Sequence, residues 1–555
     1  MDRQESEQQG GLLSTHAWEA LAGHLEEMRH LHLRDLFMDD PARAERMSLN
    51  EAGWYLDYSK NRVLPRTLEL LVQLAKECHL PNQIDAMFNG GKINTSEARQ
   101  ALHVALRMPP GNGVQVDGHD VLPDVLRVLR RMEALAEKLH SGAYTGGTGK
   151  TIRNVVNLGI GGSAIGVSMA SAALQHYARQ DMRFRFVSNE DDADFLQATR
   201  DLDPRETLFI VCSKTWNTAE TLHNAASARA WCLDDLQDED AIQAHFVAVT
   251  GNREAAIKSG IAAERVFEVW DWVNGRYSLC SAMGLALMAA IGPAGFREML
   301  AGCHDMDTHF RSAPLERNLP VLHGLMAIWN NNCLGSRTAA VLPYDHALRQ
   351  FPSYVQQLMM ESNGKSVTQH GDAVRLQTSP VYWGACGTNG QHSFHQLLHQ
   401  GTQEVPCDFI GFLSPLAASP ARHRDLLANM FAQAEALAFG QSLAQESAGM
   451  GAARHRHVPG NRPTNTLLAA RLTPRSLGAL VALYEHSAFT QGVIWNIDSF
   501  DQWGVELGKT LARRIAGELD TGADSMKEHD SSTRALMQKY LDARTGTLMC
   551  DAAQT

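Results

Sequence analysis

The sequence predicts an α/β protein with two parallel-sheet units flanked by helices, a helical N-terminal region and a C-terminal arm. In residues 154–269, short β-type runs alternate with helical segments, which is typical of a doubly wound parallel sheet. Two of these runs end in polar or glycine-rich turns that lead into helices, and a second alternation begins at Thr338. Because ligands of such sheets bind at the carboxyl ends of strands, we expect the functional site at these turns.

The elements follow this order along the chain. Periodic apolar residues predict helices in the first 140 residues, for example over Thr67–Ala75 and Arg99–Leu106. The first unit has strand candidates at Asn154–Leu158, Phe184–Val187, Leu208–Cys212, Phe246–Thr250 and Val266–Val269. The second has Thr338–Tyr344, Val381–Trp383 and Asp408–Leu413, with helices near Asp425–Phe439 and Trp503–Glu518. We therefore expect a helical region at 1–140, a first domain at 141–290, a connection at 291–335, a second domain at 336–505 and an arm at 506–555.

Composition narrows the class of protein. A length of 555 residues exceeds one typical core, and 44% hydrophobic with 20% charged residues is the balance of a globular protein. The net charge of −12 works against nucleic acid and anionic lipid as partners. The polar start lacks a secretory signal, and the apolar stretch Ala282–Ile291 is shorter than the roughly 20 residues of a membrane span. Nine scattered cysteines without metal-type spacing favour reduced thiols, no metal and a cytoplasmic location.

The stretch from Leu208 to Thr221 has the features of a phosphate-binding turn. Its apolar strand ends at Ser213, Lys214 and Thr215, and a helix follows Thr218. Hydroxyls, an ammonium group and the unpaired amides of a helix N-terminus together suit a phosphate. The same pattern also fits an ordinary buried strand followed by a polar turn and an N-cap.

A second turn, Gly159–Gly166, repeats this layout with glycines and one hydroxyl. Gly161 and Gly162 allow positive φ and close approach of the backbone to a ligand, and Ser163 follows them. The spacing is neither a dinucleotide fingerprint nor a Walker loop, which argues against a nicotinamide cofactor or ATP. Tight turning alone is the alternative reading of these glycines.

Three further segments carry groups that can do chemistry. A helix predicted from Pro352 to Met360 delivers Gln357 and Glu361 to its end, although a surface glutamate near a C-cap fits as well. His392 follows a glycine-rich turn near the start of a helix and can act as acid or base at neutral pH. A helix after Phe500 places Gln502, Glu506 and Lys509 roughly on one side, where helical ion pairing is the plainer alternative.

Together these segments resemble the glucose-6-phosphate isomerase family over nearly the whole chain. Besides the turns above, the resemblance rests on Leu56–Asn61, Lys92–Asn94, Ala101–Arg107, Val187–Asn189, Trp270–Ser278, Met360–Lys365 and Phe500–Lys509. It implies two flavodoxin-like sugar-isomerase (SIS) domains, a homodimer, and the interconversion of glucose 6-phosphate and fructose 6-phosphate in glycolysis and gluconeogenesis. It implies no metal and no organic cofactor.

The resemblance also implies a role for each matched residue. Glu361 matches the family's base, and Arg276 matches the cation that stabilises the intermediate. His392 and Lys509 match the pair that assists ring opening, with the histidine supplied by the neighbouring subunit. The phosphate contacts match Ser213, Lys214, Thr215 and Thr218. The other substrate contacts match Gly162, Ser163, Gln357 and Gln502.

Five positions depart from the family's pattern. Asn274 stands where glycine is usual, Trp216 and Asn217 replace Phe-Thr, and Ala385 and Cys386 replace Glu-Pro. None of them is a residue matched to catalysis. Two alternatives to the isomerase stay open, namely a phosphosugar-binding module without catalysis and a dual glucose/mannose phosphate isomerase.

Overall fold

The computed structural model describes residues 12–111, 113–416, 419–441, 454–521 and 528–544. The chain divides into two compact units, Met1–Phe500 and Asp501–Thr555. The first contains both large sheets and all but the last two of the α-helices described below. Each unit is described by itself.

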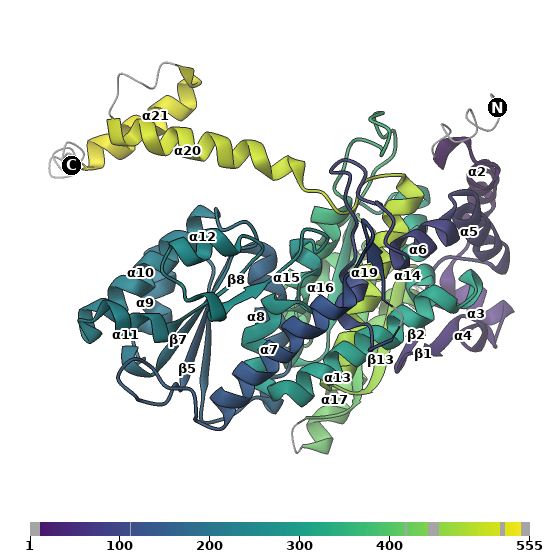
Figure 1. Ribbon diagram of the computed structural model, residues 1–555. Coiled ribbons are helices and arrows are strands. Elements are labelled where there is room, and N and C mark those ends of the chain that lie inside the picture. The colour runs from purple at the N-terminus through teal and green to yellow at the C-terminus, as the bar shows by residue number, and fades with distance from the viewer. Residues whose placement is uncertain (1–11, 112, 417–418, 442–453, 522–527, 545–555) are drawn as a thin grey trace. The chain divides into compact units, whose positions relative to one another are not determined.

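The first sheet of the larger unit is parallel throughout and has the order β6-β5-β7-β8-β9 (Figure 1). Its strands are β5 (Asn154–Leu158), β6 (Arg183–Val187), β7 (Thr207–Cys212), β8 (Phe246–Thr250) and β9 (Val266–Glu268). All five agree with the predicted runs to within one residue. The predicted α/β class is therefore confirmed.

Both faces of this sheet are covered, because successive side chains of a strand point to opposite sides. In β7, Leu208 and Ile210 belong to the core that includes helices α7 (Leu122–His140) and α13 (Leu285–Ser312). Phe209 packs on the other side, in a core that includes α9 (Asp192–Thr199) and α10 (Ala219–Leu236). Strand β7 is buried at all six positions, which fixes the start of the loop that follows it.

The second sheet has the order β1-β2-β13-β12-β10-β11. Strands β10 (Thr338–Pro343), β11 (Val381–Trp383), β12 (Cys407–Ser414) and β13 (Thr464–Arg471) are parallel. The antiparallel hairpin of β1 (Ser48–Glu51) and β2 (Trp54–Asp57) pairs with β13. We did not predict β1, β2 or β13, since two four-residue strands within a helical region show no extended alternation and their partner lies about 400 residues away in the chain.

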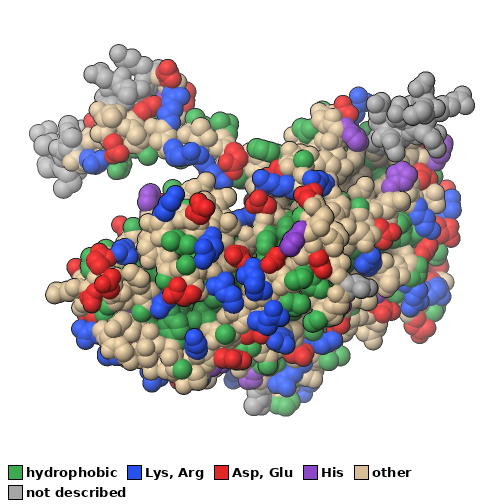
Figure 2. Space-filling model, in the orientation of Figure 1, with side chains coloured by type: hydrophobic (Ala, Val, Ile, Leu, Met, Phe, Trp, Pro, Cys, Tyr) green, Lys and Arg blue, Asp and Glu red, His purple; other side chains and the backbone are tan. Residues whose placement is uncertain are grey.

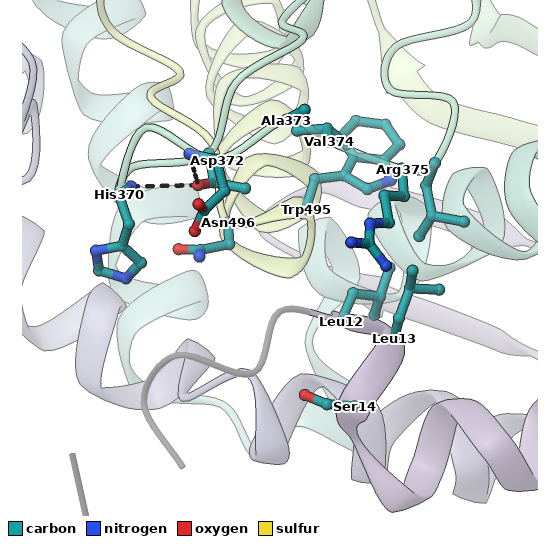
Figure 3. Close-up of a pocket in the computed structure, with 12 residues that line it drawn as sticks. Leu12, Leu13, Ser14, His370, Asp372, Ala373, Val374, Arg375, Trp495 and Asn496 are labelled. Carbon is teal, nitrogen blue, oxygen red and sulfur yellow. Dashed lines mark hydrogen bonds between the residues drawn. The ribbon is translucent and has the colours of Figure 1, made fainter. Parts of the chain in front are cut away.

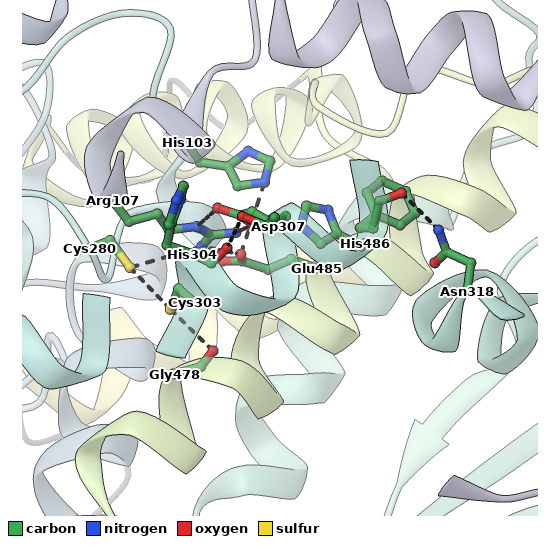
Figure 4. Close-up of polar contacts among 12 residues, drawn as sticks. His103, Arg107, Cys280, Cys303, His304, Asp307, Asn318, Gly478, Glu485 and His486 are labelled. Carbon is green, nitrogen blue, oxygen red and sulfur yellow. Dashed lines mark hydrogen bonds and ion pairs between the residues drawn. The ribbon is translucent and has the colours of Figure 1, made fainter. Parts of the chain in front are cut away.

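Two long helices, α13 and α19 (Pro474–Trp495), cross at close range inside this unit. A Cβ atom at Gly302 would lie 1.8 Å from the carbonyl oxygen of Arg475, and one at Gly478 would lie 2.0 Å from that of Met299. Only glycine fits at these two positions, so the helix backbones approach directly. Further along both helices lies a buried group of charged side chains, which includes Asp307 of α13 and Glu485 of α19 (Figure 4).

The remaining helices surround these elements. In the first unit they are α2 (His16–Met28), α3 (Leu33–Asp39), α4 (Arg43–Arg46), α5 (Pro65–Glu77), α6 (Leu80–Phe88), α8 (Ile165–Ala173), α11 (Glu239–Ile242), α12 (Arg253–Lys258), α14 (Leu319–Ile328), α15 (Phe351–Gln356), α16 (His395–Gln400) and α17 (Pro420–Phe439). A small hairpin joins β3 (Gln115–Val116) and β4 (His119–Asp120). The second unit holds α20 (Glu506–Thr521) and α21 (Ser531–Arg544), and Glu518 of α20 pairs with Arg514 and His529.

On the face shown in Figure 2, acidic and basic side chains lie beside one another over much of the surface. Exposed ion pairs such as Arg205 with Asp235 contribute little to stability, because water and salt screen their charges. Within the described ranges, no helix is long and apolar enough to cross a membrane. No group of three or more His, Cys, Asp or Glu side chains among those residues is arranged to hold a metal ion.

Candidate active site

The glycine-rich turn after β5 packs directly against the segment that carries Arg276. Residues Gly161–Ser163 form a short 3₁₀ turn before α8. A Cβ atom at Gly162 would lie 2.2 Å from the carbonyl carbon of Gly275, so the close contact requires glycine. The hydroxyl of Ser278 donates to the carbonyl oxygen of Gly162 at 3.2 Å. The turn is therefore joined to segment 271–278, as we call Asp271–Ser278 below.

The loop after β7, residues 213–218, carries several hydroxyl groups next to the start of α10. The Ser213 hydroxyl donates to Thr218 Oγ1 at 3.2 Å, and the Thr215 hydroxyl donates to Asn217 Oδ1. Thr218 is the residue immediately before α10, where the first amides of an 18-residue helix lack intrahelical partners. Hydroxyls and such amides form an environment that suits an anion.

Lys214 links this loop to segment 271–278. Its ammonium group donates to the carbonyl oxygens of Asp271 and Val273, each at 2.9 Å. Burial lowers the pKa of Lys214. Both acceptors are neutral carbonyl oxygens, and among the residues that the structure describes no carboxylate accepts a hydrogen bond from this ammonium group.

Glu361 lies at the end of a π-helical turn, Gln357–Glu361, that continues α15. Wide turns of this kind often occur at functional sites. Gln357 Nε2 donates to Glu361 Oε2 at 3.0 Å, and Arg276 Nη1 lies 3.7 Å from the same oxygen. The Glu361 side chain is 26% exposed, so its carboxylate is accessible to a ligand while its orientation is held.

Arg276 is buried, and oxygen atoms of two serines accept hydrogen bonds from it. Its Nε donates to Ser362 Oγ at 2.8 Å, and its Nη2 donates to the carbonyl oxygen of Ser499 at 2.6 Å. Sequence reasoning missed Ser362 and Ser499. For Ser362, adjacency to Glu361 was the one available signal, whereas a backbone carbonyl leaves no signal in the sequence.

Segment 271–278 is where these parts meet. Lys214 contacts Val273, Gly162 contacts Gly275, and Arg276 contacts both Ser362 and Glu361. Loop 213–218, the glycine turn and the carboxylate thus converge, although they come from residues spread over about 200 positions.

Three further predicted site residues are described by their own surroundings. His392 is exposed in a short 3₁₀ turn, and among the described residues it makes no hydrogen bond or ion pair. Gln502 and Lys509 belong to the second unit. There, Lys509 Nζ donates to Glu506 Oε1 at 2.8 Å on α20.

The departures from the family's pattern have distinct local roles. Asn274 Nδ2 donates to the carbonyl oxygen of Phe500 at 2.5 Å. Trp216 is buried at a positive φ of 55°, and the Asn217 amide accepts from Thr215. Cys386 donates to the carbonyl oxygen of Asp345 at 3.4 Å, and burial raises its pKa to about 11, so it is a protonated thiol. We found no contact that explains Ala385.

A cavity of about 450 Å³ lies elsewhere in the first unit (Figure 3). Residues Leu12–Ser14, the loop from Thr368 to Leu376, Trp495 and Asn496 line it. None of the predicted site residues is among them. The candidate active site is therefore defined by the strand ends and segment 271–278, not by this cavity.

A family model and individual relatives of known name place the chain in the same family. A family model described as phosphoglucose isomerase matches residues 57–537. A glucose-6-phosphate isomerase from Deinococcus deserti is 58% identical over 96% of this chain and 99% of its own length. One from Nitrosospira multiformis is 56% identical over 94% and 97%.

Among solved structures, a glucose-6-phosphate isomerase from Chlamydia trachomatis superimposes with a TM-score of 0.83 and 33% identity. The match covers 98% of this chain and 100% of that one. With its convergent strand-end turns and its accessible carboxylate, the chain belongs to the phosphoglucose isomerase family.

Proposed function

We propose that this protein interconverts D-glucose 6-phosphate and D-fructose 6-phosphate, as an aldose–ketose isomerase of glycolysis and gluconeogenesis. The observation that carries the proposal is the convergence on segment 271–278 of a hydroxyl-rich loop and an accessible carboxylate, with a buried guanidinium on the segment itself. The loop suits the phosphate of the sugar, and the carboxylate suits the proton transfer. Family membership and full-length similarity to glucose-6-phosphate isomerases support the same activity.

The phosphate end is assigned to loop 213–218. The hydroxyls of Ser213, Thr215 and Thr218 and the first amides of α10 hold the phosphate oxygens, with the charge of Lys214 nearby. Gly162, Ser163 and Gln357 contact the sugar, as does Gln502. Fixing the phosphate orients the reacting carbons, which is worth more in rate than binding alone.

Ring opening comes first, since the substrate arrives as a closed ring. The bond between C1 and the ring oxygen breaks, the ring oxygen gains a proton, and the anomeric hydroxyl loses one to become the C1 carbonyl. We assign this exchange to His392 and Lys509. Its demand for a proton donor and acceptor at neutral pH fits an imidazole.

Proton transfer between carbons follows. The Glu361 carboxylate takes the proton from C2, the electron pair forms a C1–C2 double bond, and negative charge develops on the C1 oxygen. Arg276 offsets that charge. The resulting cis-enediol receives the proton at C1 from Glu361, while the C2 hydroxyl loses its proton and the C1 oxygen gains one, so product and substrate are isomers.

Three further assignments belong to this proposal. The protein forms a homodimer in which His392 enters the neighbouring subunit's site, and the exposure of His392 supports this. The enzyme is cytoplasmic and uses no metal or organic cofactor. The five-part division at residues 140, 290, 335 and 505 is proposed as its domain organisation.

A coupled assay tests the activity. Fructose 6-phosphate is supplied with NADP and an excess of glucose-6-phosphate dehydrogenase, and NADPH is followed by absorbance. We expect a steady rate proportional to enzyme concentration. Binding of fructose 6-phosphate without NADPH formation would instead indicate a phosphosugar-binding module, and comparable turnover of mannose 6-phosphate would indicate a dual isomerase.

A further inference from the structure

The first part of segment 271–278 lies outside any sheet or helix. Residues Asp271–Asn274 come after β9, which ends at Glu268, and before the 3₁₀ turn Gly275–Tyr277. Backbone oxygens near a protein interior need hydrogen-bond partners, and here the carbonyls of residues 271, 272 and 273 take theirs from distant parts of the chain. The position of this stretch therefore depends on a few individual contacts.

One ammonium group holds two of these three carbonyls. Lys214 Nζ donates to the carbonyl oxygens of Asp271 and Val273, each at 2.9 Å. The amide of Leu102 donates to the third, that of Trp272, at 3.0 Å. Val273 is fully buried, so the loss of the ammonium group would leave an acceptor at a buried residue without this donor. The Lys214 side chain thus connects loop 213–218 to segment 271–278.

The backbone of Lys214 is itself fixed on the sheet. Its carbonyl oxygen accepts from the amide of Gly251 at 2.8 Å and from the hydroxyl of Thr250 at 3.2 Å. The amide of the preceding residue, Ser213, donates to the carbonyl oxygen of Val249 at 3.1 Å. These acceptors and donors lie at the end of β8, next to the end of β7. The side chain of Lys214 therefore reaches segment 271–278 from a fixed base.

The Lys214 contacts lie close to Arg276 along the chain. Only Asn274 and Gly275 separate Val273 from Arg276. The guanidinium lies beside Glu361, and the backbone that carries it is the backbone that Lys214 holds. A shift of Val273 would therefore move Arg276 relative to loop 213–218.

We propose that Lys214 is a positioning residue, which holds segment 271–278 against loop 213–218 so that Arg276 and the bound phosphate keep a fixed separation. This inference rests on the proposed isomerase function, and it gives Lys214 a role beyond its charge near the phosphate. In that function the loop holds the phosphate and Arg276 faces the C1 oxygen. Because a misplacement of about 1 Å can cost about 10²-fold in rate, the contacts that set this separation matter for turnover.

Kinetics of Lys214→Met test this role, since the variant keeps an unbranched side chain and removes the ammonium group. In the coupled assay, kcat should fall about 10- to 100-fold while KM for fructose 6-phosphate stays within about threefold, because the hydroxyls and helix amides around the phosphate are unchanged. Lys214→Arg keeps N–H donors and should recover part of kcat. A rise in KM larger than the fall in kcat would overturn the proposal, since Lys214 would then act on binding alone.

A matched control is Lys150→Met, which removes an exposed lysine that pairs with Asp203 in the same unit. This variant should leave kcat and KM unchanged. A fall in kcat as large as that of Lys214→Met would overturn the proposal, because loss of any lysine would then have the same effect.

Hydrogen exchange of the free protein tests the positioning without turnover. In Lys214→Met, amides of segment 271–278 should exchange about 10-fold faster or more, while those of α2 exchange as in the wild type. Unchanged exchange in the segment, or an equal increase in both regions, would overturn the proposal. An inactive wild type in the coupled assay would instead contradict the proposed function, since the exchange comparison needs no activity.

A double-mutant cycle shows whether the kinetic effect passes through Arg276. In an Arg276→Met background, Lys214→Met should lower kcat no further. Independent, additive losses of kcat would contradict the positioning role.

Discussion

Two buried arginines of the first unit, Arg107 and Arg276, make different contacts. Arg107 donates to both oxygens of Asp307 at 2.7 Å and to Glu485 at 2.6 Å, inside the group of side chains shown in Figure 4. Arg276 donates to the hydroxyl of Ser362 and the carbonyl oxygen of Ser499, and its Nη1 lies 3.7 Å from Glu361 Oε2. Both are almost fully buried, at 4% and 3% exposure.

The two arginines therefore differ in which parts of the unit they join. Around Arg107, the carboxylates of Asp307 and Glu485 raise the arginine's pKa even though burial opposes it. These ion pairs join the segment His103–Arg107 to α13 and α19. Arg276 lies instead beside the accessible carboxylate of Glu361. Because the two arginines are buried to the same degree, their surroundings distinguish them and burial does not.

The largest expected effect on activity comes from replacing Glu361, whose carboxylate lies beside Arg276. Glu361→Gln removes the proposed base but keeps the size of the side chain, so kcat should fall about 10²- to 10⁴-fold. Calorimetry should show that fructose 6-phosphate still binds, because loop 213–218 is unchanged. Glu69→Gln, at an exposed ion pair with Arg66, serves as the control. Substantial turnover by Glu361→Gln would remove Glu361 from the mechanism.

The next largest effects come from replacing the two arginines, since one replacement should mainly lower stability and the other should mainly lower activity. Arg107→Met leaves two buried carboxylates without their cation, which typically costs about 3–5 kcal/mol of stability. Arg276→Met removes the hydrogen bonds to Ser362 and Ser499, at about 1–3 kcal/mol, but should also lower kcat about 10²- to 10³-fold, because the proposed charge stabilisation is lost. Urea unfolding and the coupled assay measure the two quantities. Equal proportional losses of stability and activity in both variants would contradict separate roles for Arg107 and Arg276.

The stability of the folded state should depend on pH through Glu485, which belongs to the group around Arg107. Burial raises the pKa of Glu485 to about 7, although Arg107 opposes it, so the folded state holds this proton more tightly than the unfolded chain does. The folded state therefore loses stability from this group as pH rises from about 4.5 to about 7, with little change above.

Glu485→Gln removes this dependence. The stability of the variant relative to the wild type should increase between pH 5.5 and pH 8, by on the order of 2 kcal/mol, in urea unfolding at a series of pH values. Glu69→Gln should show no such trend. A constant difference between Glu485→Gln and wild type over this range would mean that Glu485 does not titrate there.

The smallest expected effect concerns Asn274, next to the Arg276 site. Asn274→Ala removes the hydrogen bond to the Phe500 carbonyl and should cost about 0.5–1.5 kcal/mol. Asn274→Gly should cost about 0.5–1 kcal/mol more, because glycine loses more backbone freedom on folding. Activity should remain within a few-fold of wild type in both variants. A large fall in kcat would show that Asn274 takes part in positioning Arg276.

The local pattern of apolar and polar residues was sufficient to predict part of the fold. The strands before Gly159 and Ser213 are short apolar runs that end in polar or glycine residues, and their periodicity depends only on neighbours in the chain. The fold class and the first sheet followed from that pattern. The residue types of the candidate site, Glu361 and Arg276 among them, followed from motif resemblance, and their roles remain proposals.

Tertiary structure alone decided the rest. The pairing of β2 with β13, the two carboxylates around Arg107 and the hydroxyl and carbonyl around Arg276 join residues far apart in sequence. The contacts of a buried arginine depend on which acceptors the fold brings within about 3 Å of it. A sequence specifies the arginine, but packing selects its partners, and those partners determine what its charge can do.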